Sequence, residues 1–201
     1  MRMSGDGMEK GYVQVYTGDG KGKTTAALGL SMRAVGRGLR VMMIQFMKRW
    51  GYGEHIAARR LEPELTIVQV GKPYLIAREG EMDEATREMV SDDVVIFPPG
   101  EPPSEILDLA CEGMDLARET LVGGKVDVLI LDEINVALHY GLVQLDEVLD
   151  LLDERPDNVE VVLTGRGAPI EIIDRADLVT EMKEIKHYFR DGVFARRGIE
   201  E

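Results

Sequence analysis

The stretch TGDGKGKTT, residues 17–25, constrains the fold of this chain more than any other feature. Residues 22–24 match the closing G-K-[ST] of the phosphate-binding pattern G-x-x-x-x-G-K-[ST]. That pattern requires a glycine at position 17, where this sequence has Thr17, and the glycine stands at Gly18 instead. The loop is therefore one residue shorter than the common form, and it carries an additional lysine, Lys21.

The segments on either side of this loop have the character that a phosphate-binding loop requires. Residues 12–17 alternate β-branched and aromatic side chains, which predicts a strand, and residues 24–36 carry apolar side chains at helical spacing. Glycines let backbone N–H groups turn towards phosphate oxygens, and a helix start adds the positive end of its dipole. The residues expected to bind phosphate are Gly18, Asp19, Gly20, Lys21, Gly22, Lys23, Thr24 and Thr25. A flexible surface turn is the alternative, which the flanking strand and helix disfavour.

The rest of the chain alternates predicted strands and helices. Further strands are expected at 40–47, 65–70, 125–133, 159–167 and 178–182. Helices are expected from Ser104, as N-cap, to Gly123, from Leu145 to near Pro156, and over 169–176. This alternation predicts an α/β fold with a mainly parallel sheet and helices on both faces, formed by residues 1–201 as a single domain.

Two segments depart from the alternation. Residues 1–10 are expected to be flexible, and residues 71–103 to form an irregular excursion. Within the excursion, the run DDVVIFPPGEPP indicates a short strand before a proline-rich turn, and a short helix is expected near 83–90.

Asp132 and Glu133 end the most apolar predicted strand. Ligands of open α/β sheets bind outside the carboxyl ends of the strands, where carboxylates can hold Mg²⁺. Thr24 can offer its hydroxyl to the same ion. Spacing alone does not decide which carboxylate contacts the metal, and a solvent-facing strand end is the alternative. Arg166, in a glycine turn after another strand, is a candidate charge clamp for phosphates.

Composition narrows the classes of ligand. The net charge of −13 argues against a nucleic-acid or anionic-membrane binder. Residues 1–60 nevertheless carry 11 Lys and Arg against 4 Asp and Glu, whereas the remaining residues carry 13 against 33. A basic end on an acidic protein suits a small anionic ligand.

No stretch is typical of a signal peptide or long enough to span a membrane, so we expect a cytoplasmic protein. The one cysteine, Cys111, is expected in the core.

Several blocks together resemble one family, the P-loop-type ATP:corrinoid adenosyltransferases. They are YTGDGKGKTTAALGLSMRAVGRG, IQFMK, LILDE, LTGRGAP followed by DRADLVTEM, and ARRGIE near the end of the sequence. The resemblance implies a RecA-like P-loop fold, usually in a homodimer. It implies transfer of the 5′-deoxyadenosyl group of ATP to the cobalt of a reduced corrinoid, with release of triphosphate. The short loop is typical of the family and holds ATP in the orientation opposite to that of most P-loop enzymes.

The resemblance also implies roles for individual residues. Lys21 and Lys23 would neutralise charge on the leaving triphosphate, and Thr24 and Glu133 would be the Mg²⁺ partners, with Asp132 beside them. Arg33 matches a family arginine at the nucleotide site. An electron-donor flavoprotein is an expected partner, since cobalt must be reduced. Because reduced cobalt is itself a strong nucleophile, no activated Ser, Cys or His is needed, and the three histidines are expected to be structural or on the surface.

One segment departs from the family pattern. The family usually has aromatic residues after the third strand that close the lower face of the corrinoid, whereas this sequence has VGKPYLIAREGE at 70–81. Tyr74 is the candidate substitute there, with Trp50 or Tyr52 expected nearby. This departure leaves two alternatives open: a P-loop NTPase or small-molecule kinase, in which Glu133 would orient water or a hydroxyl, and a non-catalytic nucleotide or corrinoid binder.

Overall fold

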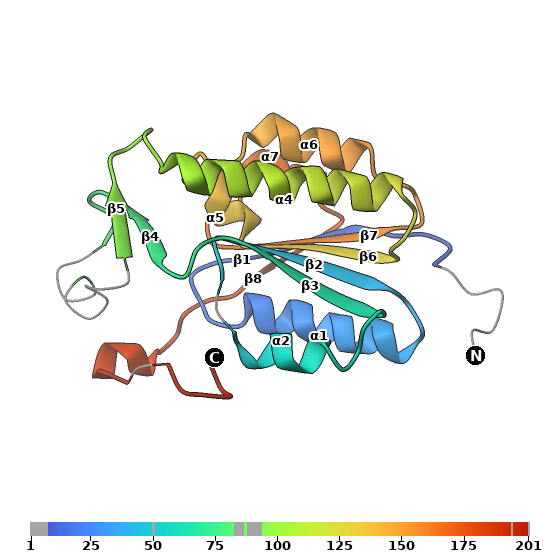
Figure 1. Cartoon of the computed structure of the whole chain (residues 1–201), viewed down its shortest axis with the longest axis horizontal. Coiled ribbons are helices and arrows are strands. Elements are labelled where there is room, and N and C mark those ends of the chain that lie inside the picture. Colours follow the sequence, from blue (N-terminus) through green and yellow to red (C-terminus); the bar gives the residue numbers. More distant parts are fainter. Residues whose placement is uncertain (1–7, 50, 83–86, 88–93, 194, 201) are drawn as a thin grey trace.

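The computed structural model describes residues 8–49, 51–82, 87, 94–193 and 195–200. Its centre is a six-stranded parallel sheet with the order β3-β2-β6-β7-β1-β8 (Figure 1). The strands are β1 (Val13–Thr17), β2 (Val41–Phe46), β3 (Leu65–Val70), β6 (Val128–Asp132), β7 (Glu160–Thr164) and β8 (Leu178–Glu181). Each lies within a stretch predicted to be a strand, and the parallel α/β architecture is confirmed.

Burial explains which strands are central. Every residue of β6 and β7 is buried, as expected for apolar runs covered on both faces. The edge strand β8 is exposed along its whole length. The strand β7 lies between β1, which leads into the glycine-rich loop, and β6, which ends at Asp132. This order brings the loop and the carboxylates to one edge of the sheet, as in RecA-like P-loop folds.

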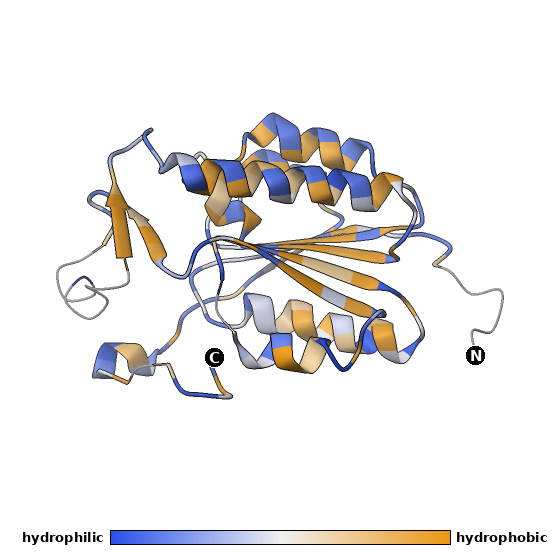
Figure 2. Ribbon diagram, viewed as in Figure 1, coloured by the Kyte–Doolittle hydropathy of each residue, from blue (hydrophilic) through white to orange (hydrophobic). Residues whose placement is uncertain are grey.

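Helices cover both faces of the sheet (Figure 1). One face packs against α1 (Lys23–Gly36) and α2 (Gly53–Ala58), and the other against α4 (Ser104–Val122), α5 (Ile134–His139), α6 (Leu145–Asp153) and α7 (Ile170–Arg175). Two separate apolar clusters result, one on each face. Figure 2 shows the same division, with hydrophobic strands in the middle and hydrophilic residues on the outer sides of the helices.

Two details of α4 differ from expectation. Its N-cap is Pro103, whose carbonyl accepts from the N–H groups of Ile106 and Leu107, and Ser104 is the first helical residue. Cys111 is exposed, although a core position was predicted. The reason is helical geometry, since the neighbouring Ala110 and Met114 take the buried face against the sheet.

The segment 71–103 contains regular structure that the sequence only partly indicates. β4 (Leu75–Arg78) and β5 (Val94–Phe97) pair in parallel as a small second sheet. The β5 strand lies in the predicted run, whereas β4 was not anticipated. The short helix expected near 83–90 falls mostly outside the described residues, as do residues 1–7 of the segment expected to be flexible. Within the described residues, no helix is long and apolar enough to cross a membrane.

Candidate functional site

The glycine-rich loop connects β1 to α1 at the carboxyl edge of the sheet, as predicted. Lys23 is buried, with 7% of the residue exposed, and its Nζ donates to the carbonyl oxygens of Gly18 at 2.6 Å and Gly20 at 2.8 Å. Burial lowers the pKa of the Lys23 ammonium. The lysine therefore closes the loop on itself and places a positive charge at the start of α1, where the helix dipole has the same sign.

Glycine is required in this loop because the chain packs tightly below it. Gly18 has a φ of +90°, and a Cβ there would lie 2.5 Å from the carbonyl oxygen of Met182, just after β8. A Cβ at Gly20 would lie 2.7 Å from the backbone of Lys183, and the Gly20 N–H donates to the Met182 oxygen at 2.7 Å. The loop is thus anchored to the segment that follows the last strand.

Asp132 is the organising centre of the site. It is fully buried and accepts four side-chain hydrogen bonds. The donors to Oδ1 are Thr24 at 2.8 Å and Thr164 at 2.7 Å, and those to Oδ2 are Lys48 at 2.8 Å and Gln45 at 3.1 Å. These donors come from α1, β7, β2 and the residues after β2. One carboxylate at the end of β6 therefore ties the phosphate-binding helix to the two neighbouring strands, β2 and β7.

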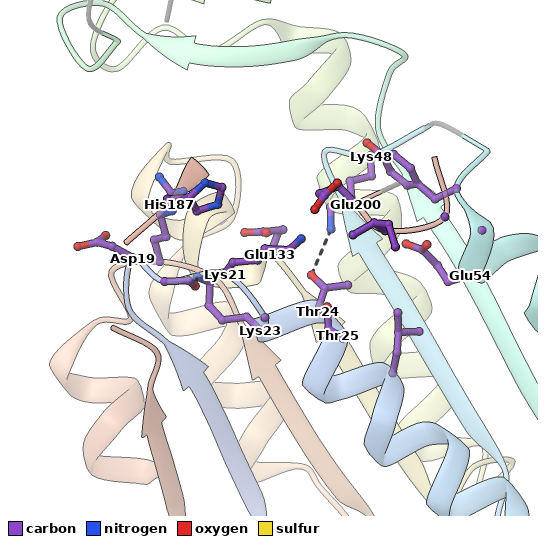
Figure 3. A pocket seen from close by; sticks show the side chains of 18 residues that line it. Asp19, Lys21, Lys23, Thr24, Thr25, Lys48, Glu54, Glu133, His187 and Glu200 are labelled. Carbon is purple, nitrogen blue, oxygen red and sulfur yellow. Dashed lines mark hydrogen bonds between the residues drawn. The ribbon is translucent and has the colours of Figure 1, made fainter. Parts of the chain in front are cut away.

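Lys48 is a site residue that the sequence reasoning did not select. Its Nζ lies 2.8 Å from Asp132 Oδ2 and 3.4 Å from Thr24 Oγ1, the contact dashed in Figure 3. Burial opposes its charge, but Asp132 and Glu133 outweigh that effect, and the pKa of Lys48 is raised. Met47, just before it, has a φ of +58°, a left-handed conformation that costs about 1–2 kcal/mol in a non-glycine residue. The available signal was a lysine directly after a buried strand.

Glu133 faces the same cavity, near Lys23 and Lys21 (Figure 3). Its φ of +65° is also left-handed, so the chain turns sharply between β6 and α5, and its N–H donates to Thr164 Oγ1 at 3.0 Å. Burial raises the pKa of its carboxyl group, against the opposing effect of Lys48. Two strained non-glycine residues thus stand at adjacent strand ends, as is common at functional sites.

Lys23, Lys48 and Glu133 line an open cavity of about 580 Å³. Its wall is formed by residues 19–25, Leu28, Lys48, Tyr52, Gly53, Glu54, Glu133, Arg166, His187, Gly198, Ile199 and Glu200. Arg166 reaches the cavity from the predicted glycine turn, in which Gly165 has a φ of +129° and packs against Asn135. Apart from Gly18, every predicted loop residue lines this cavity.

The last described residues of the chain also reach the cavity, which was not predicted. After β8 the chain forms a short 3-10 helix, η1 (Tyr188–Asp191). Glu200 accepts hydrogen bonds from Tyr188 Oη and from Arg196 Nη2 at 3.1 Å, and the Arg196 guanidinium lies 4.9 Å from the centre of the Tyr188 ring. This small cluster holds Ile199 and Glu200 against the cavity.

Besides Gly18 and the buried Asp132, two further predicted site residues lie outside the cavity wall. Arg33 is an exposed residue in the last turn of α1, about 15 Å along the helix from Lys23 at 1.5 Å per residue. Tyr74 precedes β4, and its hydroxyl donates to Glu105 on α4, which also pairs with Lys72 at 2.9 Å. Tyr52, expected near Tyr74, lines the cavity instead, and Trp50 lies outside the described residues.

The oxygen atoms of the site suit a hard divalent cation. Thr24, Asp132 and Glu133 bring one hydroxyl and two carboxylates together at the start of α1. Among the described residues, no group of three or more His, Cys, Asp or Glu side chains is placed to hold a metal ion. Mg²⁺ commonly binds to one or two carboxylates and takes its other ligands from phosphate oxygens and water. The site fits that pattern rather than an all-protein metal cage.

Comparison with known proteins agrees with this geometry. Residues 9–200 match the family described as ATP:corrinoid adenosyltransferase BtuR/CobO/CobP. The chain is 37% identical to the corrinoid adenosyltransferase of Escherichia coli K12 over 194 residues, covering 96% of this chain and 86% of that one. It is 33% identical to the corrinoid adenosyltransferase of Pseudomonas aeruginosa over 193 residues, covering 96% and 84%.

A solved structure supports the fold independently. The flagellar accessory protein FlaH from Methanocaldococcus jannaschii superposes with a TM-score of 0.50 and 12% identity, over 88% of this chain and 73% of that one. Identity at this level supports the shared fold alone. Fold, site and relatives lead to one conclusion: the chain belongs to the ATP:corrinoid adenosyltransferase family, enzymes that transfer the adenosyl group of ATP to a corrinoid.

Proposed function

We propose that the cavity binds ATP with Mg²⁺ and presents ribose C5′ to the corrinoid. The observation that carries this proposal is the junction of Thr24, Asp132 and Lys48 beside the loop. It joins the phosphate-binding helix to the carboxylates that suit the metal. Lys21, Lys23 and Arg166 line the same cavity and supply positive charge for a triphosphate.

In the proposed reaction the electron pair of reduced cobalt forms a bond to C5′. The bond between C5′ and the α-phosphate oxygen breaks, and triphosphate leaves with that electron pair. Lys21, Lys23 and Lys48 then oppose the negative charge that develops on the leaving group, in positions fixed before the reaction. Mg²⁺, when bound through Thr24, Glu133 and Asp132, would neutralise further charge on the same oxygens.

We propose that the corrinoid approaches from the side of β4 and β5. This small sheet extends beyond the carboxyl edge of the main sheet (Figure 1). Its base is tied to α4 through Tyr74 and Glu105. The same segment replaces the aromatic stretch of the family, so Tyr74 is the candidate for contact with the lower corrinoid face.

Replacing Tyr74 with alanine should therefore impair turnover with corrinoid more than it impairs binding of ATP. A separate variant, Arg33→Ala, tests the role expected of that arginine in ATP binding.

Three broader features are also proposals. A homodimer is supported by the open edge strand β8, where Leu178 and Val179 are 45% and 41% exposed. A flavoprotein electron donor is supported by the chemistry, because cobalt must be reduced in single-electron steps. A cytoplasmic location is supported by the use of ATP as co-substrate.

Product analysis tests the proposal directly. The protein is incubated with ATP, Mg²⁺ and chemically reduced corrinoid, and the corrinoid spectrum is followed while nucleotide products are separated. Adenosylated corrinoid with one triphosphate per turnover is expected. Formation of ADP and phosphate would favour an NTPase or kinase, and tight ATP binding without any product would favour a binding protein.

A further inference from the structure

A chain of hydrogen bonds runs from the buried carboxylate of Asp132 to α2. The Gln45 Nε2 donates to Asp132 Oδ2 at 3.1 Å, and Gln45 Oε1 lies 2.7 Å from His55 Nε2. The other ring nitrogen, His55 Nδ1, accepts from the backbone N–H of Tyr52 at 3.1 Å. Gln45 and Asp132 are both fully buried, so neither can exchange these partners for water.

This chain has a single consistent direction. The N–H of Tyr52 can only donate, so His55 Nδ1 is the acceptor and neutral imidazole carries its proton on Nε2. That proton points at Gln45, which must present its oxygen to the ring and its NH₂ group to Asp132. A reversed amide would face its NH₂ towards another donor and its oxygen towards a carboxylate. The histidine at 2.7 Å, with a longer contact of 3.5 Å from Gln69 Nε2 to the same oxygen, therefore fixes the orientation of the glutamine.

His55 also shapes the cavity wall. By accepting from Tyr52 it completes a capping box at the start of α2. The residues around that start, Tyr52, Gly53 and Glu54, line the cavity. One side chain thus joins the helix that borders the cavity to the carboxylate that holds Thr24.

We propose that His55 is a positioning residue for metal-dependent ATP binding. It acts through Gln45, whose fixed NH₂ group holds Asp132 Oδ2 and leaves Oδ1 directed at Thr24. The inference rests on the proposed function, in which Thr24 and Asp132 stand at the Mg²⁺ position. The inference adds His55 as a residue that acts without contacting ATP. It also separates the two ring nitrogens, since Nε2 orients Gln45 and Nδ1 caps the start of α2.

Two substitutions separate these roles. In His55→Gln the amide nitrogen can take the place of Nε2 and donate to Gln45, while in His55→Asn the shorter side chain can keep only the cap at Tyr52. The measurement is the Kd of ATP by titration calorimetry, with and without Mg²⁺. His55→Asn should lose about three- to tenfold in affinity with Mg²⁺, the effect of one net hydrogen bond. His55→Gln should stay close to wild type, and neither variant should change the affinity measured without Mg²⁺.

A double-mutant comparison tests the route through Gln45. In a Gln45→Met background, His55→Asn should cause no further loss of Mg²⁺-dependent affinity, because its effect has already been removed. His139→Gln is the matched control, since that histidine pairs with Glu81, does not line the cavity and should leave ATP affinity unchanged. Chemical denaturation of each variant identifies any loss that arises from unfolding.

The outcomes are distinguishable. Equal Mg²⁺-dependent affinity for His55→Asn and His55→Gln, or an undiminished His55→Asn effect in the Gln45→Met background, overturns the positioning role and leaves the proposed function intact. A wild-type protein that binds ATP equally well with and without Mg²⁺ overturns the metal part of the proposed function, and the positioning role with it.

Discussion

Asp132 shows how much of this site depends on one residue. Its carboxylate accepts from Thr24, Thr164, Gln45 and Lys48, and it has no exposed surface. In Asp132→Asn, two donors would face an NH₂ group and the Lys48 charge would lose its partner. We expect unfolding in denaturant to show a loss of about 3 kcal/mol, the low end for a broken buried ion pair because Lys48 is partly exposed.

The control for this substitution is Asp150→Asn, which removes an exposed carboxylate on α6. Its free energy of unfolding should stay within about 0.5 kcal/mol of wild type. Overlapping unfolding curves for wild type and Asp132→Asn would contradict the organising role of Asp132.

The pH dependence of stability should carry a contribution from His55. Burial lowers the pKa of its imidazole from 6.5, against the opposing effect of Glu54. The unfolded chain therefore binds a proton more readily than the folded one, so stability is greatest above pH 6.5 and falls as the pH drops below it. His55→Gln, which cannot titrate, should lose less stability than wild type between pH 7.5 and 5.5 in denaturant unfolding. An identical pH dependence would contradict this.

At the scale of single residues, the sequence predicted those functional side chains that belong to short local motifs. Lys23, Thr24 and Asp132 were identified because each closes a strand or opens a helix. Gln45 and Lys48 were not, because their partner Asp132 lies 87 and 84 positions away. Their contact arises because β2 pairs with β6 with Gln45 opposite Asp132, and nothing local states which strands become neighbours.

The loop between β1 and α1 gives a test at the level of an element. In Gly18→Ala the new Cβ would meet the Met182 carbonyl at 2.5 Å, at a φ of +90° that disfavours a side chain. Gly29→Ala is the matched control, since Gly29 lies inside α1 with open space around it. Gly18→Ala should lower both stability and ATP affinity, whereas Gly29→Ala should stabilise by about 0.5–1 kcal/mol. Thermal unfolding and calorimetry measure the two effects, and an unchanged Gly18→Ala protein would contradict the anchoring of the loop.

Elements were predictable when they were long and apolar or strongly periodic. Among the short ones, β5, β8 and α7 lie in predicted stretches, whereas β4 and α5 do not: β4 has four residues and forms through its pairing with β5, and α5 has six residues that follow the left-handed Glu133. Such elements depend on tertiary neighbours more than on intrinsic propensity. They are also the elements that surround the proposed corrinoid side, which explains why that half of the site was the least determined by sequence.

At the scale of the whole molecule, positive and negative residues are distributed unevenly along the sequence, and the strand order brings positive side chains together around the cavity. The cavity lysines Lys21, Lys23 and Lys48 all come from the basic first 60 residues, because β1, α1 and β2 lie there. Arg166 arrives from the acidic remainder through β7, the neighbour of β1. An acidic protein thus gathers positive charge at one edge of its sheet, where a triphosphate would bind.

Residues 195–200 should be held over that cavity by Glu200. Hydrogen bonds from Arg196 and Tyr188 lower the pKa of Glu200 to about 2, so the cluster is complete at neutral pH and is lost only as the pH falls through that value. In Glu200→Gln the charge that pairs with Arg196 is absent. We expect faster trypsin cleavage at Arg196 and Arg197 and weaker ATP binding, with the unfolding temperature of the protein unchanged.

ATP should slow trypsin cleavage of the wild-type protein, because Ile199 and Glu200 line the cavity in which ATP would bind. Glu171→Gln, an exposed change on α7, should behave as wild type. Equal cleavage of wild type and Glu200→Gln, with ATP and without, would show that this cluster does not hold the segment over the site.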